Sequence, residues 1–182
     1  MWEVSQRVEA LEVDEVAHIL KSRIEMYREA KFARAEINPG DLRLMSKNIE
    51  RYKLFRITVL EEMRARNNLP EMGKIVGSPW PYMLPLVERR PDGSLVVIDG
   101  AHRVWHALNR SAPNIPVILI DGVTADLPAE PLPNLDSVVV THQKWARTER
   151  YTNYRPAYFR PVQDAIRERL WLEVDKSQLP KL

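Results

Sequence analysis

The feature that most constrains this chain is the Asp-Gly-Ala-His-Arg segment at residues 99–103. It directly follows an apolar run at 95–98 and opens a stretch of helical character at 104–108. A strand that ends in a glycine turn and leads straight into a helix leaves backbone N–H groups free, and the helix dipole adds partial positive charge there. Such a corner binds anions, and an arginine in it can hold phosphate through two parallel hydrogen bonds. The sequence therefore predicts a phosphate-binding corner.

Each residue of the corner has a predicted part in a phosphate or nucleotide site. Arg103 is the main candidate for phosphate contact, with a surface ion pair as the alternative. His102 is expected to donate to a phosphate oxygen, to act as a general acid, or simply to bond locally at the start of the helix. Asp99 is expected to orient His102, to coordinate Mg²⁺ or to cap the helix. Gly100 supplies the tight turn, and Ala101 completes the predicted binding set.

A second histidine follows the corner at helical spacing. His106 lies four residues after His102, so the two share one face of the predicted helix. Because no third ligand stands at a suitable spacing, no metal site is expected, and His106 is expected to pack near the sheet.

The pattern around the corner predicts a compact α/β unit. A Pro-Asp-Gly turn separates two predicted strands, and a helix and a buried strand follow. The expected ranges are 82–88, 94–98, 101–109 and 115–120. We therefore expect an α/β (α+β) fold with a small mixed sheet, added N-terminal helices and a C-terminal tail. If the strands that flank the helix are parallel, a right-handed crossover should join them.

Residues 1–70 are predicted to form a mainly helical part packed on a core at 71–125, with a C-terminal extension at 126–182. Apolar residues at helical spacing predict one helix from Asp14 to the Asn-Pro-Gly break at 38–40, and a second that Asp41 caps. The segment 54–60 fits neither the helical nor the strand period, and Asn-Asn-Leu-Pro at 67–70 ends it.

Composition narrows the classes of protein. Hydrophobic residues make up 45% of the 182 residues, which suffices for a core, and the net charge of +2 is too small to indicate nucleic-acid binding by itself. No apolar run approaches the roughly 20 residues of a membrane span, and the first four residues predict no secretory signal. The chain has no cysteine, which excludes disulfides, thiolate metal sites and a cysteine nucleophile, and a cytoplasmic setting is expected.

Positive charge is concentrated after the proline-rich connector at 126–136. Residues 142–169 carry a net charge of +4, and aromatic residues alternate there with basic ones. Such a tail can stack bases and neutralise phosphates, so it is a weak candidate for nucleic-acid binding. We favour instead a tail whose aromatic residues dock on the domain while its arginines face water, and we find no helix-turn-helix. The arginines concerned are Arg147, Arg150, Arg155 and Arg160.

The order of two strands, an Ile-Asp-Gly-x-His-Arg corner, a helix and an Ile-Pro-Val strand resembles the ParB/sulfiredoxin superfamily, over about residues 80–122. Sulfiredoxins use a cysteine where this chain has Ala101, so their chemistry is excluded. ParB partition proteins bind CTP through a Gly-Glu-Arg-Arg corner and carry a DNA reader, a pattern from which Ala101 and His102 depart. The corner is most similar to that of the free serine kinases, which hold nucleotide phosphates there and use an upstream glutamate as base. Glu36 is the candidate for that base by position.

The sequence supports two hypotheses for the function, and a third alternative is a protein without that chemistry. The first is a phosphotransferase that uses Mg²⁺ with ATP, ADP or CTP and acts on a small hydroxyl substrate, with Glu36 or another upstream carboxylate as base. The second is a non-catalytic ParB-like module that binds CTP or a nucleic-acid backbone, in which the tail extends the surface toward DNA or RNA or mediates dimerisation. The third is a phage or mobile-element accessory protein that keeps the fold without the chemistry. No membrane partner is expected.

Overall fold

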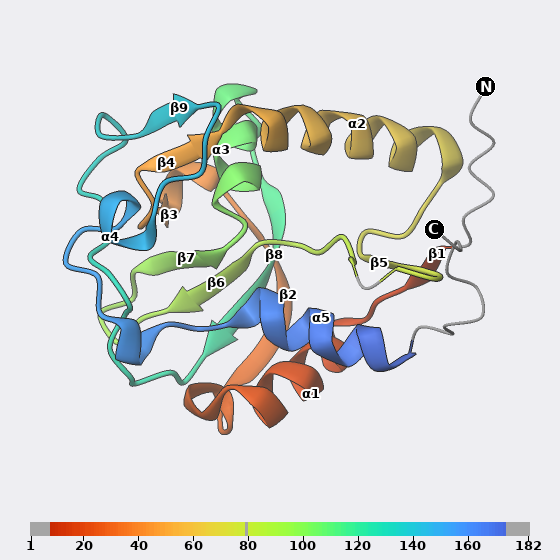
Figure 1. Ribbon diagram of the computed structural model, residues 1–182, viewed down its shortest axis with the longest axis horizontal. Coiled ribbons are helices and arrows are strands. Elements are labelled where there is room, and N and C mark those ends of the chain that lie inside the picture. The colour runs from red at the N-terminus through yellow and green to blue at the C-terminus, as the bar shows by residue number, and fades with distance from the viewer. Residues whose placement is uncertain (1–7, 79, 174–182) are drawn as a thin grey trace.

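The computed structural model describes residues 8–78 and 80–173 and is built on a five-stranded sheet in the order β2-β8-β6-β7-β3 (Figure 1). These strands are β2 (Lys31–Ile37), β3 (Leu42–Arg43), β6 (Leu86–Arg89), β7 (Leu95–Asp99) and β8 (Ile115–Asp121). β8 pairs in parallel with β6 and antiparallel with β2, while β7 is antiparallel to β6 and parallel to β3. The predicted mixed sheet is confirmed. Because β7 and β8 run in opposite directions, the conditional crossover does not arise.

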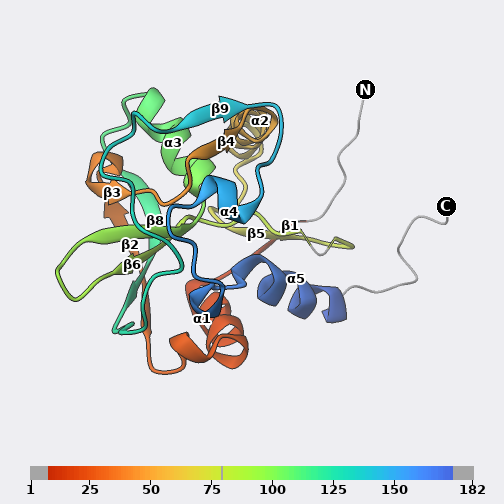
Figure 2. The same cartoon turned by 60° about the vertical axis from the view of Figure 1, so that its left-hand side comes forward.

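Helices cover both faces of the sheet, as Figure 2 shows. Side chains of a strand alternate between the two faces. On β8, an interior strand of the sheet, Ile118 and Ile120 therefore pack with α1 (Val13–Arg23) and α5 (Val162–Glu173). Val117 and Leu119 face the other way and pack with α3 (Ala101–Asn109). The apolar run of β8 is thus buried on both sides, which is why its sequence lacks a polar alternation.

The predicted long N-terminal helix is wrong in its second half. α1 ends at Arg23, a 3-10 turn follows at Glu25–Tyr27, and residues 31–37 form β2. β2 pairs with β8 along its whole length, from Lys31 opposite Asp121 to Ile37 opposite Ile115. Pairing with a distant strand overrides the helical preference of the local Ala-Arg-Ala-Glu sequence.

The second predicted helix also begins later than the sequence indicates. Asn38 accepts a hydrogen bond from the Gly40 N–H at a 3-10 turn, Pro39–Asp41, which β3 and then β4 (Asn48–Glu50) follow. β4 pairs in parallel with β9 (Val139–Thr141), a partner that local periodicity cannot reveal. The ambiguous segment 54–60 belongs to α2 (Arg51–Asn67), and Asn68 ends that helix in the left-handed conformation, as the predicted stop requires.

The remaining elements complete the layers. β1 (Val8–Ala10) and β5 (Gly73–Ile75) form a two-stranded ribbon, and the strand predicted at 82–88 begins only at Leu86. The C-terminal part holds α4 (Arg147–Arg150) and a 3-10 turn at Pro156–Tyr158 before α5. None of the helices among the described residues is both long and apolar enough to cross a membrane.

The three predicted parts of the chain share one sheet and its core. Residues before 70 supply β2 and β3 to the central sheet, so they are more than a helical layer on a core at 71–125. The proline-rich connector buries Ala129 and Leu132 against that core, and α5 covers one face of the sheet. The first four residues, where no secretory signal is predicted, and residues 174–182 of the predicted extension lie outside the described residues.

Candidate functional site

The predicted corner has the expected strand–turn–helix geometry. β7 ends at Asp99, and Gly100 adopts a left-handed conformation with φ of 92° as the N-cap of α3. A Cβ at Gly100 would lie 2.8 Å from the Cα of Pro85. The turn therefore requires glycine twice, once for its backbone conformation and once for close packing against the chain before β6.

The N-terminus of α3 presents free donors. Arg103 and Val104 donate their N–H groups to the Gly100 carbonyl, and no side chain caps the helix. Within the described part of the chain, the N–H groups of Ala101 and His102 have no hydrogen-bond partner. These two groups, together with the helix dipole, form the anion-binding end that the sequence predicts.

His102 is held as a neutral hydrogen-bond donor. Its Nε2 accepts the backbone N–H of Glu50 at 3.0 Å, so the ring proton lies on Nδ1. Burial, reinforced by the positive charge of Lys53, lowers the pKa of His102 to about 4, although the nearby Glu50 carboxylate opposes the shift. A neutral imidazole with its Nε2 lone pair occupied favours donation through Nδ1–H over the predicted role as general acid.

Glu50 is the carboxylate that sequence reasoning did not single out. Its side chain is buried, with Oε1 2.7 Å from Lys53 Nζ and 3.8 Å from His102 Nε2. Burial raises the pKa of Glu50, but the hydrogen bond and charge of Lys53 outweigh it, and the net pKa is lowered. The available signal was a glutamate directly before a helix and upstream of the corner. Glu50, however, lies beside His102 because it ends β4, a strand that the sequence did not predict.

Arg103 lies in the site without a partner in the described part of the chain. Its guanidinium makes no hydrogen bond or ion pair with any described residue, so the predicted alternative of a surface ion pair is not observed there. Burial lowers the pKa of Arg103, and the charge of Arg64 on α2 adds to this shift, while the charges of Asp99 and Glu61 oppose it. A partly buried guanidinium that pairs with no carboxylate can bind a negatively charged group.

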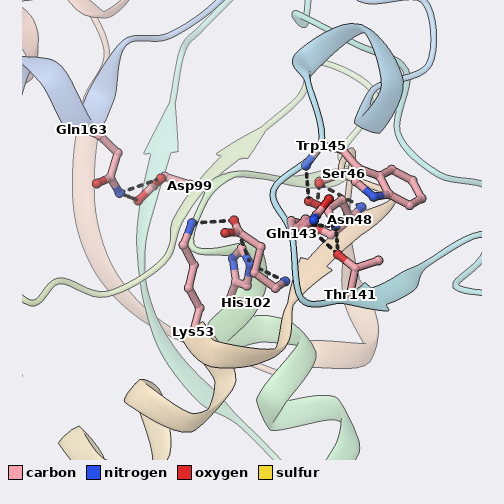
Figure 3. A network of polar contacts seen from close by, with 10 residues as sticks. Ser46, Asn48, Lys53, Asp99, His102, Thr141, Gln143, Trp145 and Gln163 are labelled. Carbon is pink, nitrogen blue, oxygen red and sulfur yellow. Dashed lines mark hydrogen bonds and ion pairs between the residues drawn. The ribbon is translucent and has the colours of Figure 1, made fainter.

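The side chain of Asp99 is held by α5, which covers the opposite face of the sheet from α3. Both carboxylate oxygens accept hydrogen bonds from Gln163 Nε2 of α5, at 3.0 and 2.9 Å, as Figure 3 shows. Asp99 neither caps α3 nor bonds His102, so two of its three predicted roles are not observed. Coordination of Mg²⁺ remains a prediction, and a single carboxylate fits it because Mg²⁺ takes most of its ligands from water and substrate phosphates.

The assignment of Glu36 as base is corrected by the sheet order. Glu36 lies on edge strand β2, which β8 and β6 separate from β7, so three strand spacings, roughly 14 Å, stand between it and the corner. Its carboxylate pairs with Arg34, which also binds Glu71 at 2.7 Å. The three residues form a surface ion-pair group away from the site. The prediction from position along the chain therefore placed Glu36 too close to the corner.

His106 does not share a partner with His102 among the described residues and contacts a carboxylate of α2 instead. Its Nε2 lies 3.2 Å from Glu61 Oε2 on α2, and the same oxygen is 2.6 Å from Arg110 Nη1. The predicted packing against the sheet is replaced by this contact between α2 and α3. Among the described residues, no group of three or more His, Cys, Asp or Glu side chains is arranged to hold a metal ion.

A segment of the C-terminal tail is pinned beside the corner (Figure 3). The Asn48 amide nitrogen donates to Thr141 Oγ1 at 2.7 Å and to the Gln143 carbonyl at 3.3 Å. Asn48 Oδ1 accepts the Trp145 N–H at 3.0 Å. One buried amide thus fixes residues 141–145 against β4. We call residues 139–151 the strap.

The four tail arginines do not form one surface, which corrects the predicted nucleic-acid site. Arg160 is 3% exposed, and its Nε lies 3.0 Å from the buried carboxylate of Glu88. Arg155 pairs with Asp126 at 3.3 Å, and Arg147 lies 4.0 Å above the ring of Phe159.

The expected docking of the tail aromatics is observed for Tyr151, which packs against Met45, Val96 and Ala129 of the core. The expectation that the tail arginines face water is wrong for the buried Arg160. The guanidinium of Arg150, on the strap, lies 4.9 Å from the centre of the Tyr151 ring, and its charge acts on His102.

Comparisons of the chain with protein-family models, with curated proteins and with solved structures gave no match.

Proposed function

We propose that this protein is a ParB/sulfiredoxin-like nucleotide-binding protein that holds nucleotide phosphates at the N-terminus of α3. The observation that carries the proposal is that successive residues supply three kinds of donor that have no partner among the described residues. They are the free N–H groups of Ala101 and His102, the Nδ1–H of His102 and the guanidinium of Arg103. Phosphate oxygens accept hydrogen bonds from donors of each kind.

The charges around the corner suit a polyphosphate better than a neutral ligand. Arg103 and Arg64 act on each other electrostatically at one side of α3, and Lys53 lies at the other, beside His102. Asp99, at the end of β7, is the carboxylate placed to share Mg²⁺ with the phosphates. The ion would screen phosphate charge and polarise the terminal phosphorus centre.

The enzymatic form of the proposal is phosphoryl transfer to a small hydroxyl substrate. The similarity of the corner to that of the free serine kinases supports it, and such transfer asks mainly for positioning and charge stabilisation. The base would not be Glu36. Glu50 is the nearer upstream carboxylate, although its ion pair with Lys53 would have to open before it could accept a proton.

Calorimetric titration with ATP, ADP and CTP in the presence of Mg²⁺ tests the proposal. We expect one nucleotide to bind, and Arg103→Ala to weaken it by at least about tenfold, since a charged hydrogen bond contributes roughly 1.5–3 kcal/mol. Arg28→Ala is the matched control, because Arg28 is an exposed arginine of the α1 region whose nearest carboxylate oxygen is 3.9 Å away.

The pattern of results separates the alternatives. Binding of ATP followed by Mg²⁺-dependent formation of ADP with a hydroxyl acceptor supports the phosphotransferase. Binding of CTP without turnover supports the non-catalytic ParB-like module. If no nucleotide binds, or if Arg103→Ala binds like the wild type, the proposed site is wrong.

A further inference from the structure

Hydrogen bonds hold the backbone of the strap against the neighbouring chain. Besides the three hydrogen bonds of Asn48, the Lys47 N–H donates to the Arg150 carbonyl at 2.8 Å, and the Val139 N–H donates to the Lys47 carbonyl at 2.7 Å. Ser46 and Tyr151 form a further antiparallel bridge. Both ends of the strap are therefore tied to the chain that leads into α2.

This anchoring brings positive charges together around one carboxylate. Lys144 and Arg150 of the strap meet Lys53 of α2, and all three act on His102. Glu50 is already paired with Lys53 at 2.7 Å, so its single negative charge, which also acts on Lys144, faces three positive charges. Burial and then the charge of Arg150 lower the pKa of Lys144, as expected for a cation held near another cation.

The side chains also lack hydrogen-bond acceptors. Within the described residues, the exposed Lys144 and the guanidinium of Arg150 make no hydrogen bond or ion pair, and Arg150 Nε is buried without a hydrogen-bond partner. The guanidinium lies over the ring of Tyr151, 4.9 Å from its centre, which leaves its charge without an anion. Buried polar atoms are normally satisfied, and like charges held close together destabilise a fold. A doubly negative group between Lys144 and Arg150 would offset both charges.

We propose that the strap binds a second phosphate group, the dianionic monoester of a small molecule that occupies the site beside the nucleotide. The inference deepens the proposed function and rests on it for the identity of that neighbour. A small phosphorylated ligand fits better than a nucleic acid, because Arg147, Arg155 and Arg160 are engaged within the fold and leave no continuous basic track. For a phosphotransferase, the monoester would be a phosphorylated acceptor.

Titration calorimetry with two probes, inorganic phosphate and glycerol 3-phosphate, tests the second site in protein saturated with Mg²⁺-ADP or, if no nucleotide binds, in free protein. We expect glycerol 3-phosphate to bind, and Lys144→Gln and Arg150→Gln each to weaken it at least tenfold. Arg150→Lys should recover part of the affinity, since the charge is kept while the buried Nε is lost. Arg155→Gln, a tail arginine paired with Asp126, is the matched control.

The outcomes distinguish the two proposals. Loss of glycerol 3-phosphate binding in the strap variants with ADP affinity unchanged within threefold supports the second site. If the strap variants instead lose ADP, the strap belongs to the nucleotide site and the inference is wrong. If inorganic phosphate binds and the monoester does not, the monoester assignment is wrong. If no nucleotide binds but the strap variants still abolish monoester binding, the proposed function fails while the strap site stands.

Discussion

At the scale of single residues, the corner contains groups in unusual states: a neutral buried histidine, an arginine without a carboxylate partner among the described residues, and a glycine with positive φ. His102 is neutral because it is buried among cations, and its Nε2 is committed to the N–H of Glu50. Arg103 keeps its charge without a carboxylate partner among the described residues. Gly100 is required by a backbone angle and by the proximity of Pro85. Each of these features carries some cost to the stability of the fold, and under the proposed function each would serve ligand binding.

The lowered pKa of His102 predicts acid lability. In the folded protein the ring binds its proton with a pKa of about 4, against about 6.5 when unfolded, so the unfolded state holds more protons between these values. His102 should therefore contribute a loss of up to about 3 kcal/mol in unfolding free energy as pH falls from 6.5 to 4. Urea titrations across this range should show a shallower pH dependence for His102→Gln, whose side-chain oxygen can accept the Glu50 N–H. The control His18→Gln, on an exposed face of α1, should retain the wild-type slope.

Substitution of two glycines separates backbone strain from steric overlap. Gly93 and Gly100 both have positive φ, of 84° and 92°, but only Gly100 lacks space for a Cβ. We expect Gly93→Ala to cost roughly 1 kcal/mol and Gly100→Ala about 1–3 kcal/mol more, because Pro85 must move. Chemical denaturation of both variants measures the difference. Equal losses would show that Pro85 accommodates the added methyl group freely.

At the scale of elements, the tail is joined to the sheet by buried polar contacts. On β6, the Glu88 carboxylate receives the guanidinium of Arg160, Arg90 Nη1 at 2.6 Å and the Tyr27 hydroxyl at 2.9 Å. The chain thereby enters α5 at a defined place, and α5 in turn positions Asp99 through Gln163. The geometry of the corner therefore depends on an element some sixty residues further along the chain.

Removal of Arg160 should be far more damaging than removal of another tail arginine. Arg160→Ala leaves the carboxylate of Glu88 buried with one charged partner fewer, a change that typically costs about 3–5 kcal/mol. Arg155→Ala breaks a partly exposed pair with Asp126 and should cost less than about 1 kcal/mol. Thermal unfolding of the two variants compares them directly. Similar melting temperatures would contradict the structural role assigned to Arg160.

At the scale of the whole molecule, the chain is interleaved rather than modular. The central sheet takes its strands from residues 31–121, and one face of it is covered by α1 together with α5. The strap then reaches back to β4 and reinforces the corner from the other side. Unfolding of any one layer exposes apolar surface of the others, so the described residues should unfold cooperatively.

A fragment limited to the predicted core tests this interleaving. Residues 71–125 contain β6, β7, α3 and β8 but lack β2, which pairs with β8, and the two helices that cover one face. We expect the fragment to be unfolded, and residues 8–173 to unfold in a single transition. Far-ultraviolet circular dichroism and dispersion of amide proton shifts report on both. A folded fragment would show that the core is an independent domain.

The corner could be predicted from the sequence alone. A strand, a glycine turn and a helix are specified by residues adjacent in the chain, as are β7, α3, β8 and the end of α2. The identity of the distant groups that meet at the corner depends on the tertiary structure. β2 and β4 form because distant strands pair with them, and that pairing placed Glu50 rather than Glu36 beside His102. The burial of Arg160 and the position of Lys144 likewise depend on contacts across the chain. Local periodicity reports only what a segment prefers alone, whereas pairing and burial free energies come from partners far away in sequence.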